Sequence, residues 1–369
     1  MLAARTLLTV CVLLFALHVW AEETPAMFRC GPERTGVAAG EELQPQPSAP
    51  VAMLFKVGDD VVSSPISDRK ALYFGSEAKK IHALGLEKWA LSWTFDVGAK
   101  VISSPALAAG VLYFGAQDGT CFAVHAHNGK EKWRFKTERQ IYSSPAVVEG
   151  VVYFGSGDKH VYALDAETSK EKWRFATKGQ VLASPAVAHE SVYVGSEDHF
   201  LYALNSVDGK PRWSFKAQGG INGSAAVSGG KVFFGCLKFL VYALDEKTGT
   251  VAWKFATKGR IYASPAVAEG KVYVASEDQH VYALELTSGK ELWRYKTGGA
   301  VCSSPVLAGK AVLVGSHDKK LYVLNAADGV VLWTVRTQAA IDGTPLVLNG
   351  QVYFGSRDGN MYHVPSARK

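Results

Sequence analysis

The sequence predicts an all-β protein, an eight-bladed β-propeller built from four-stranded antiparallel blades. Two residue types recur every 40 residues along most of the 369-residue chain. Tryptophan does so at Trp93, Trp133, Trp173, Trp213, Trp253, Trp293 and Trp333. Proline does so at Pro65, Pro105, Pro145, Pro185, Pro265, Pro305 and Pro345, and Ala225 fills the missing place. A fixed period of this length indicates a repeated supersecondary unit, and the proline series counts eight units.

Each unit contains four short apolar runs, which we interpret as four strands. In the fourth unit these runs cover residues 180–187, 192–196, 201–204 and 212–215. Turn residues such as Asp208 and Gly209 separate the runs, because glycine adopts a positive φ without steric cost. The runs are apolar on both faces, so each sheet must be covered on both sides by neighbouring sheets. Blades arranged in a ring satisfy this requirement.

The two ends of the repeat array complement each other. The eighth unit stops before its tryptophan strand, whereas residues 53–55 align with residues 93–95 and precede the first complete unit. We therefore expect the N-terminal strand to complete the eighth blade and close the ring, which removes two exposed sheet edges. The repeated tryptophans should lie between blades, in a structural role.

The N-terminal residues have the pattern of a signal peptide. Arg5 precedes a short apolar run over residues 7–16, and small residues lie around Ala21. We divide the chain into a signal peptide (1–21), a leader segment (22–50) and the propeller (51–369). No later stretch has enough unbroken apolar residues to cross a membrane, so we expect a soluble monomer in the periplasm or outside the cell, with no transmembrane segment.

Composition and cysteine placement exclude several classes of function. A net charge of +6 with 20% charged residues is too weak for the basic stripe of a nucleic-acid-binding protein, so we expect no nucleic-acid partner. Cys30, Cys121, Cys236 and Cys302 are far apart and form no CxxC pair. This spacing indicates neither a zinc site nor a redox motif, and we expect free thiols.

Two stretches carry a resemblance to a known family. Residues 163–173 and residues 243–253, each ending in tryptophan, resemble the tryptophan-docking motif of propellers related to pyrroloquinoline-quinone (PQQ) enzymes. Residues 28–37 are similar to the short leader that often precedes such propellers. The resemblance covers nearly all of the chain after the signal peptide. It implies either a quinoprotein dehydrogenase, which binds PQQ with calcium, or a non-catalytic scaffold similar to BamB of the outer-membrane β-barrel assembly machinery.

Departures from the family patterns favour the scaffold. The dehydrogenases typically carry a vicinal disulfide under the quinone, but no two cysteines are adjacent here, and the uniform repeat leaves no inserted active-site loops. Lipid-anchored BamB-like proteins need a cysteine after the signal peptide's apolar run, whereas Cys11 lies inside that run. We therefore expect an unanchored protein that is not an enzyme, has no cofactor and binds other envelope proteins. A PQQ-binding or redox protein is the alternative, and a saccharide-binding propeller is a third possibility.

Six aspartates occupy one position of the repeat, in the turn between the second and third strands. They are Asp118, Asp158, Asp198, Asp278, Asp318 and Asp358. A ring of carboxylates could suggest calcium, but aspartate commonly caps its own turn by accepting backbone N–H bonds, so we expect turn caps and no metal site. Local spacing reveals no catalytic constellation.

The repeat is broken in the same turn of the fourth and fifth units. The position that holds polar residues elsewhere holds Phe200 and Leu240. Lys238 replaces the usual aspartate, between Leu237 and Phe239, and the turn with His199 lies on the neighbouring blade. Adjacent exposed apolar turns predict a partner-binding patch formed by these residues. The alternative is that the apolar side chains tuck under a neighbouring loop.

A second candidate site lies at the mouth of the central channel. Arg139 and Arg260 belong to loops that should share one face, and Tyr142 and Tyr262 begin the first strands of their units. These residues could attract a small anionic ligand. Ordinary solvated loops are the alternative reading.

Overall fold

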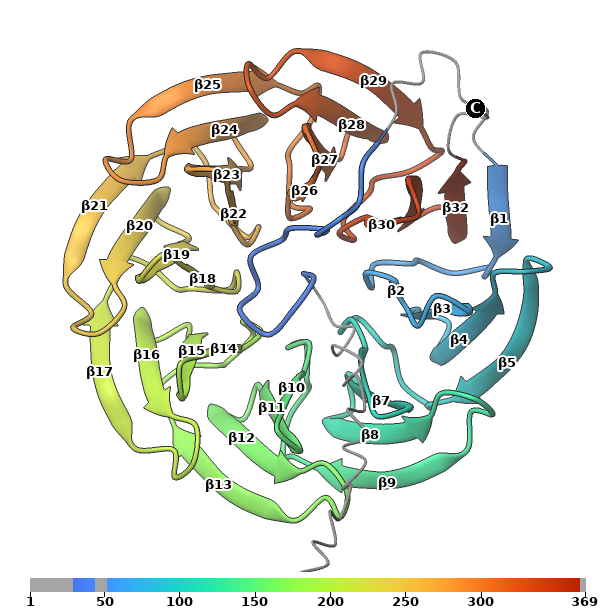
Figure 1. Cartoon of the computed structure of the whole chain (residues 1–369). Coiled ribbons are helices and arrows are strands. Elements are labelled where there is room, and N and C mark those ends of the chain that lie inside the picture. Colours follow the sequence, from blue (N-terminus) through green and yellow to red (C-terminus); the bar gives the residue numbers. More distant parts are fainter. Residues whose placement is uncertain (1–28, 44–51, 366–369) are drawn as a thin grey trace, which may run out of the picture.

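The computed structural model describes residues 29–43 and 52–365. Eight four-stranded sheets surround a central channel, which confirms the predicted eight-bladed propeller (Figure 1). All regular elements of the described residues are strands, and every strand pair is antiparallel.

The first four blades follow the chain from the inner to the outer strand. The first blade is β2 (Ile66–Ser67), β3 (Ala71–Gly75), β4 (Lys80–Gly85) and β5 (Ala90–Asp96). The second is β6 (Ala106–Ala108), β7 (Val111–Gly115), β8 (Thr120–His125) and β9 (Glu131–Lys136). The third is β10 (Ala146–Val148), β11 (Val151–Gly155), β12 (His160–Asp165) and β13 (Glu171–Ala176). The fourth is β14 (Ala186–Ala188), β15 (Ser191–Gly195), β16 (Phe200–Asn205) and β17 (Pro211–Lys216).

The last four blades repeat this order until the ring closes. The fifth blade is β18 (Ala226–Ser228), β19 (Lys231–Gly235), β20 (Leu240–Asp245) and β21 (Val251–Ala256). The sixth is β22 (Ala266–Ala268), β23 (Lys271–Ala275), β24 (His280–Glu285) and β25 (Glu291–Lys296). The seventh is β26 (Val306–Ala308), β27 (Ala311–Gly315), β28 (Lys320–Asn325) and β29 (Val331–Arg336). The eighth is β30 (Leu346–Leu348), β31 (Gln351–Gly355), β32 (Asn360–Val364) and β1 (Ala52–Lys56).

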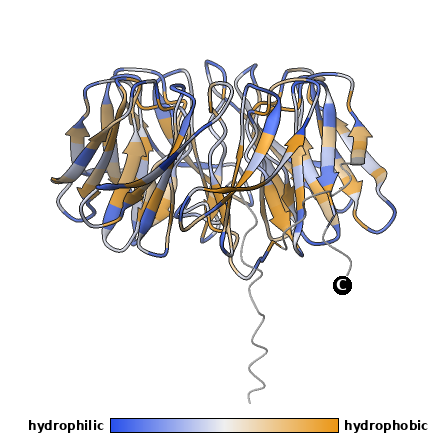
Figure 2. Cartoon of the chain, turned by 90° about the horizontal axis from the view of Figure 1, so that it is seen from above, coloured by the Kyte–Doolittle hydropathy of each residue, from blue (hydrophilic) through white to orange (hydrophobic). Residues whose placement is uncertain are grey.

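The ring has two distinct faces (Figure 2). We call the upper face the one that carries the turns between second and third strands and the connections from one blade to the next. The lower face carries the turns between first and second strands and between third and fourth strands. Because successive strands of a meander alternate in direction, these two sets of loops lie at opposite ends of every blade.

The first strand of each blade is shorter than the apolar run predicts. In the fourth blade β14 begins at Ala186, whereas the run begins at residue 180. Pro185 has no N–H to donate to a strand ladder. The residues before it line the channel, where six of the eight blades bond to the next in the same way: the backbone N–H of Ser144 donates to Oγ of Ser184 at 2.9 Å. The same step joins Ser64 to Ser104, Ser104 to Ser144, Ser224 to Ser264, Ser264 to Ser304, and Thr344 to Ser64.

The repeated tryptophans join neighbouring blades near the rim, as predicted. Nε1 of Trp173 donates to the carbonyl oxygen of Ser206 in the next blade at 2.9 Å. A Cβ added to Gly209 of that blade would lie only 2.6 Å from the Trp173 ring, so the turn needs glycine both for this close approach and for its positive φ. Equivalent bonds join Trp93 to Ala126, Trp133 to Ala166, Trp213 to Glu246, Trp253 to Leu286 and Trp293 to Ala326.

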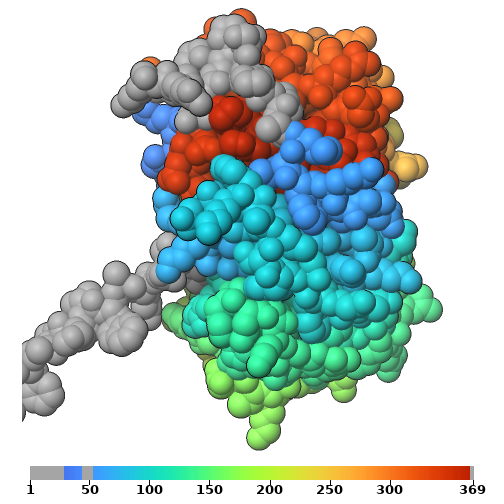
Figure 3. Space-filling view, turned by 90° about the vertical axis from the view of Figure 1, so that its right-hand side faces the viewer, coloured from blue at the N-terminus to red at the C-terminus, as the bar shows by residue number. Residues whose placement is uncertain are grey.

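The N-terminal strand closes the ring, as the sequence predicts. β1 pairs antiparallel with β32, and Figure 3 shows the first and last parts of the described chain in direct contact. Met53 aligns with the repeated tryptophans by sequence spacing, but an irregularity in β1 pairs it with Tyr362, and it is 57% exposed. Trp89, from the first blade, stacks on His363 with ring centroids 4.7 Å apart and lies 5.9 Å from Tyr353. At the contact between the eighth and first blades, the indole therefore comes from the first blade instead of the eighth.

The described part of the leader, residues 29–43, crosses the channel near the lower face (Figure 1). Its carbonyl groups accept one N–H bond from the inner strand of each of four successive blades: Pro32 from Val187, Glu33 from Val227, Thr35 from Val267, and Gly36 from Leu307. The buried guanidinium of Arg34 donates to the carbonyl oxygens of Pro185, Ser144 and Pro145 at 2.9–3.0 Å. These bonds hold the leader inside the ring.

We expect Trp173→Ala to destabilise the protein by about 3–5 kcal/mol, because it removes a buried aromatic side chain and the bond to Ser206. Trp89→Ala should lower the free energy of unfolding by less, since the Trp89 side chain is already partly exposed. Urea unfolding of the two variants measures the difference. Equal costs would show that Trp89 anchors the closing blade as firmly as the repeated tryptophans join the others.

His82 occupies a buried aromatic position in β4. Its ring stacks on Phe74 with centroids 5.0 Å apart, and Nε2 lies 3.0 Å from Oγ of Ser76. Burial lowers the pKa of His82 to about 4, so the ring is neutral in the folded protein at neutral pH. The corresponding residue of the second blade is Phe122, which stacks on Phe114 in the same way.

The low pKa of His82 predicts acid sensitivity. Between about pH 6.5 and pH 4 the unfolded chain binds a proton at this histidine and the folded chain does not, so stability falls as the pH decreases, by up to about 3 kcal/mol. His82→Phe should remove this part of the loss. Urea unfolding at about pH 7 and about pH 4.5 tests it. The same pH dependence in parent and variant would contradict the assignment.

Candidate functional site

Residues of the fourth, fifth and sixth blades surround a depression of about 410 Å³ on the upper face. Its lining residues are His199, Gly219, Gly220, Leu237, Lys238, Phe239 and Arg260, and we call it the docking depression. Four of the six residues predicted for partner binding therefore lie together, and they are joined by an arginine that the sequence analysis assigned to the channel mouth.

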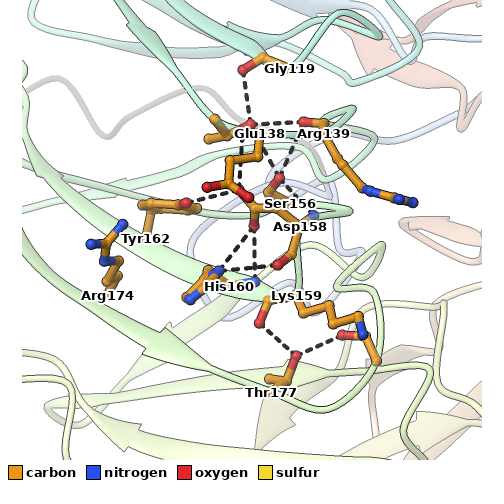
Figure 4. A network of polar contacts seen from close by, with 12 residues as sticks. Gly119, Glu138, Arg139, Ser156, Asp158, Lys159, His160, Tyr162, Arg174 and Thr177 are labelled. Atoms are coloured by element: carbon orange, nitrogen blue, oxygen red, sulfur yellow. Dashed lines mark hydrogen bonds and ion pairs between the residues drawn. The ribbon is translucent and has the colours of Figure 1, made fainter.

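The usual turn at this position is polar and capped by aspartate. In the third blade Oδ1 of Asp158 accepts the N–H of His160 at 3.1 Å, and Oδ2 accepts Tyr162 Oη–H at 2.8 Å and the N–H of Glu138 at 3.2 Å (Figure 4). The other five aspartates of the series also accept the N–H two residues on, in Asp118, Asp198, Asp278, Asp318 and Asp358. The predicted turn-capping role is confirmed.

The fifth blade lacks this cap and exposes apolar atoms. Lys238 offers no carboxylate, and Tyr242 Oη accepts the N–H of Gln218 at 3.4 Å. Phe239 holds the left-handed position of the turn, with φ of 66°, and its side chain is 40% exposed. The backbone of this turn is thus kept, while a capping aspartate gives way to a lysine and an exposed apolar side chain is added.

The other two predicted residues lie outside the lining of this depression. Phe200 is half-buried and stacks on Tyr202, with ring centroids 5.7 Å apart. Leu240 is half-buried and packs against the hydrophobic core between the fourth and fifth blades. The apolar surface of the depression consequently comes from Leu237 and Phe239.

The residues predicted for the channel mouth separate into different surroundings. Tyr142 and Tyr262 line a channel cavity of about 180 Å³. The serines that bond one blade to the next, which we call the serine ring, also line it. In this cavity Tyr142 Oη accepts a hydrogen bond from Gln117 Nε2 at 3.1 Å. Arg260 Nη1 donates to Tyr262 Oη at 3.3 Å, and its side chain also lines the docking depression. Arg139 is exposed and is not among the residues that line either cavity.

Sequence reasoning missed a polar cluster where the seventh and eighth blades meet. His317 Nε2 lies 2.6 Å from Oδ1 of Asp342, and Cys302 adjoins both side chains. The hydrogen bond to Asp342, followed by one to Cys302, raises the pKa of His317 to about 10. Burial alone would raise the pKa of Asp342, but hydrogen bonds from His317 and Arg357 hold it below its usual value.

The described cysteines form no disulfide, as predicted. Cys121 and Cys236 are buried, Cys302 is partly exposed to the channel, and Cys30 is exposed on the leader. Across residues 29–43 and 52–365 no helix is long and apolar enough to cross a membrane.

Comparison with known proteins places these features in a family. The profile of the family described as outer membrane protein assembly factor BamB matches residues 35–141, 123–236 and 216–368. No curated protein sequence gives a significant match.

Several solved structures share the fold. BamB from Moraxella catarrhalis is similar over 84% of this chain and 97% of its own, with 18% identity and a TM-score of 0.73. The computationally designed protein Ika8 is similar over 85% of this chain and 99% of its own, with 16% identity and a TM-score of 0.76. The quinohemoprotein alcohol dehydrogenase from Comamonas testosteroni is similar over 93% of this chain and 81% of its own, with 15% identity and a TM-score of 0.77.

At these identities the structural likeness shows the fold alone, whereas the family profile matches successive stretches that span nearly all of the propeller. The eight blades, the tryptophan docking and this match agree, and the chain belongs to the BamB family of PQQ-like β-propellers.

Proposed function

We propose that this protein is an exported, non-catalytic scaffold that binds another envelope protein through the docking depression. The observation that carries the proposal is the fifth-blade turn, where apolar and basic residues replace the aspartate-capped turn found in most other blades. Membership of the BamB family supports a role in protein interaction, in the assembly of envelope or outer-membrane proteins.

The chemistry of the depression defines the partner it fits. Leu237 and Phe239 offer apolar contact, and Lys238, Arg260 and His199 surround them. Apolar cores with charged rims are typical of specific protein interfaces, and basic rims attract acidic segments. The expected ligand is a segment with a large apolar side chain flanked by carboxylates.

The compartment is part of the same proposal. The signal peptide over residues 1–21 lies outside the described residues, and its removal would release the propeller into the periplasm or the medium without a lipid anchor. An envelope partner would meet the upper face, because the docking depression lies there.

The sixth blade supplies a matched replacement for the unusual turn. The triple variant Leu237→Glu, Lys238→Asp and Phe239→Gln gives the fifth blade the sequence of residues 277–279. An aspartate at 238 can accept the N–H groups of Leu240 and Gln218 and the Tyr242 hydroxyl, as Asp278 does in its own turn. We expect an unchanged or higher thermal midpoint and the loss of partner capture from isolated envelopes.

A control variant tests whether partner capture depends on the docking depression or on exposed apolar side chains in general. Val207→Ser with Val330→Ser removes two apolar side chains that are 79% and 59% exposed on the lower face. This variant should capture the same envelope proteins as the parent. Capture that survives the triple substitution, or that disappears in the control, would contradict the proposed docking site.

The alternative is a PQQ-binding protein, because a quinohemoprotein alcohol dehydrogenase has the same fold. The channel cavity of about 180 Å³ is smaller than the roughly 300–1,000 Å³ of typical small-molecule sites. A serine ring and tyrosines line it, and the repeated tryptophans lie away from it, between blades. These features do not fit a bound tricyclic quinone.

We expect no saturable binding of PQQ, with or without calcium, in isothermal titration calorimetry of the purified chain, because the serine-lined cavity of the channel is too small for it. No alcohol- or sugar-dependent dye reduction should appear after incubation with both. A saturable heat together with dye reduction would make the redox function the preferred one.

A further inference from the structure

Three side chains of different chemistry converge on the upper face where the seventh and eighth blades meet. The ligand atoms of Cys302, His317 and Asp342 all lie within 4.8 Å of one another. Cys302 and Asp342 also line the channel cavity, so the cluster faces an open space. The docking depression lies on the fourth, fifth and sixth blades, away from this cluster.

The geometry of the repeat brings the three residues together. In the second and third blades the turn residue Gln117 contacts Tyr142, which follows it by 25 residues and lines the channel in the next blade. His317 and Asp342 hold the same two positions in the seventh and eighth blades. Cys302 holds the channel position of the seventh blade, where other blades have residues such as Ile102 and Leu182. The three donors lie in loops next to β26, β27 and β30, and the packing of the seventh and eighth blades brings these loops together.

Asp342 is oriented by a partner outside the cluster. Arg357 Nε donates to Oδ2 of Asp342, and Arg357 Nη1 lies 3.3 Å from Oδ2 of Asp60. This leaves Oδ1 directed at His317. Carboxylate ligands of metal ions are commonly held by such hydrogen bonds from outside the coordination shell. The Asp60 carboxylate balances the charge of Arg357, so the positive guanidinium is compensated within the same network.

The donor set selects the class of cation. A thiolate, an imidazole and one carboxylate oxygen suit zinc and similar borderline ions, whereas magnesium and calcium prefer oxygen ligands alone. Three protein ligands with an open fourth position are the usual arrangement of zinc sites that bind a further ligand. Such a site needs donor atoms about 3.3–3.7 Å apart, from zinc bond lengths of about 2.0–2.3 Å in a tetrahedron.

We propose that Cys302, His317 and Asp342 bind one zinc ion, with its fourth position open to the channel. The His317 side chain is 39% exposed and can move away from Oδ1 of Asp342 to admit the ion between them. The ion replaces the proton that these two side chains share, and the thiol of Cys302 gives up its proton on binding. The site is a feature of this chain's seventh and eighth blades, since the other six channel positions among the described residues hold Val62, Ile102, Tyr142, Leu182, Asn222 and Tyr262.

Metal titration of the purified full-length chain tests the proposal. After treatment with a chelator, the parent should bind one zinc ion per chain tightly. Cobalt(II) as a spectroscopic probe should give a thiolate-to-metal charge-transfer absorption and the visible bands of a four-coordinate ion. Cys302→Ser and His317→Gln should each weaken zinc binding by roughly 100-fold or more, because each removes a direct ligand.

Matched controls address the other candidate ligands. Cys30→Ser removes an exposed thiol outside the cluster, and His127→Gln removes one of two histidines whose rings are 5.8 Å apart on the lower face. Both variants should bind zinc like the parent. Loss of binding in either control, or unchanged binding in Cys302→Ser, would place the ion elsewhere and overturn the proposal.

A measurement on the parent protein keeps the test independent of how the variants fold. Zinc should slow alkylation of Cys302 by iodoacetamide, as peptide mapping by mass spectrometry would show, while Cys30 reacts at an unchanged rate. A Cys302 thiol that is alkylated equally fast with and without zinc would show that these residues hold no metal ion.

Discussion

The contact between neighbouring blades is the interaction on which the rest of this structure depends. No blade can bury both of its apolar faces alone, so each one is stable only against the next. Near the rim the indole of Trp173 bonds to Ser206 and packs on Gly209. Nearer the channel, a Cβ added to Gly195 would lie only 2.2 Å from Ile221 of the next blade. Because these contacts recur at one sequence interval, the blades pack uniformly around the ring.

The ends of the chain adapt the same contacts to a ring that must close. β1 supplies the missing outer strand, but Met53 cannot replace an indole, and Trp89 of the first blade contacts Tyr353 and His363 instead. The leader uses the N–H groups of the inner strands in four blades and brings two arginines into the channel. It crosses the channel near the lower face, on the opposite side of the ring from the docking depression.

Both functional proposals rest on departures from a uniform repeat. Backbone bonds tie each turn to the preceding inter-blade loop whatever its side chains are: the N–H of Gly157 donates to the carbonyl oxygen of Gln140, and that of Leu237 to the carbonyl oxygen of Gly220, both at 2.9 Å. The fifth blade can therefore replace the capping aspartate with Lys238 and present Phe239 without distorting the ring. The seventh and eighth blades can likewise place a thiol, an imidazole and a carboxylate around one point. A rigid ring fixes these positions, and the sequence of single loops decides their chemistry.

The sequence by itself determined the period, the number of blades, the closing strand and the structural role of the tryptophans, because these follow from spacing along the chain. It also located the unusual fifth-blade turn, since that turn breaks the pattern locally. Only the tertiary structure decided that Leu240 packs into the core while Phe239 is exposed, because the burial of these side chains depends on contacts with the neighbouring blade. It alone brought Arg260 to Lys238, and Cys302 to His317 and Asp342. Those contacts join different blades, and their distances depend on how the ring packs rather than on any pattern within one repeat.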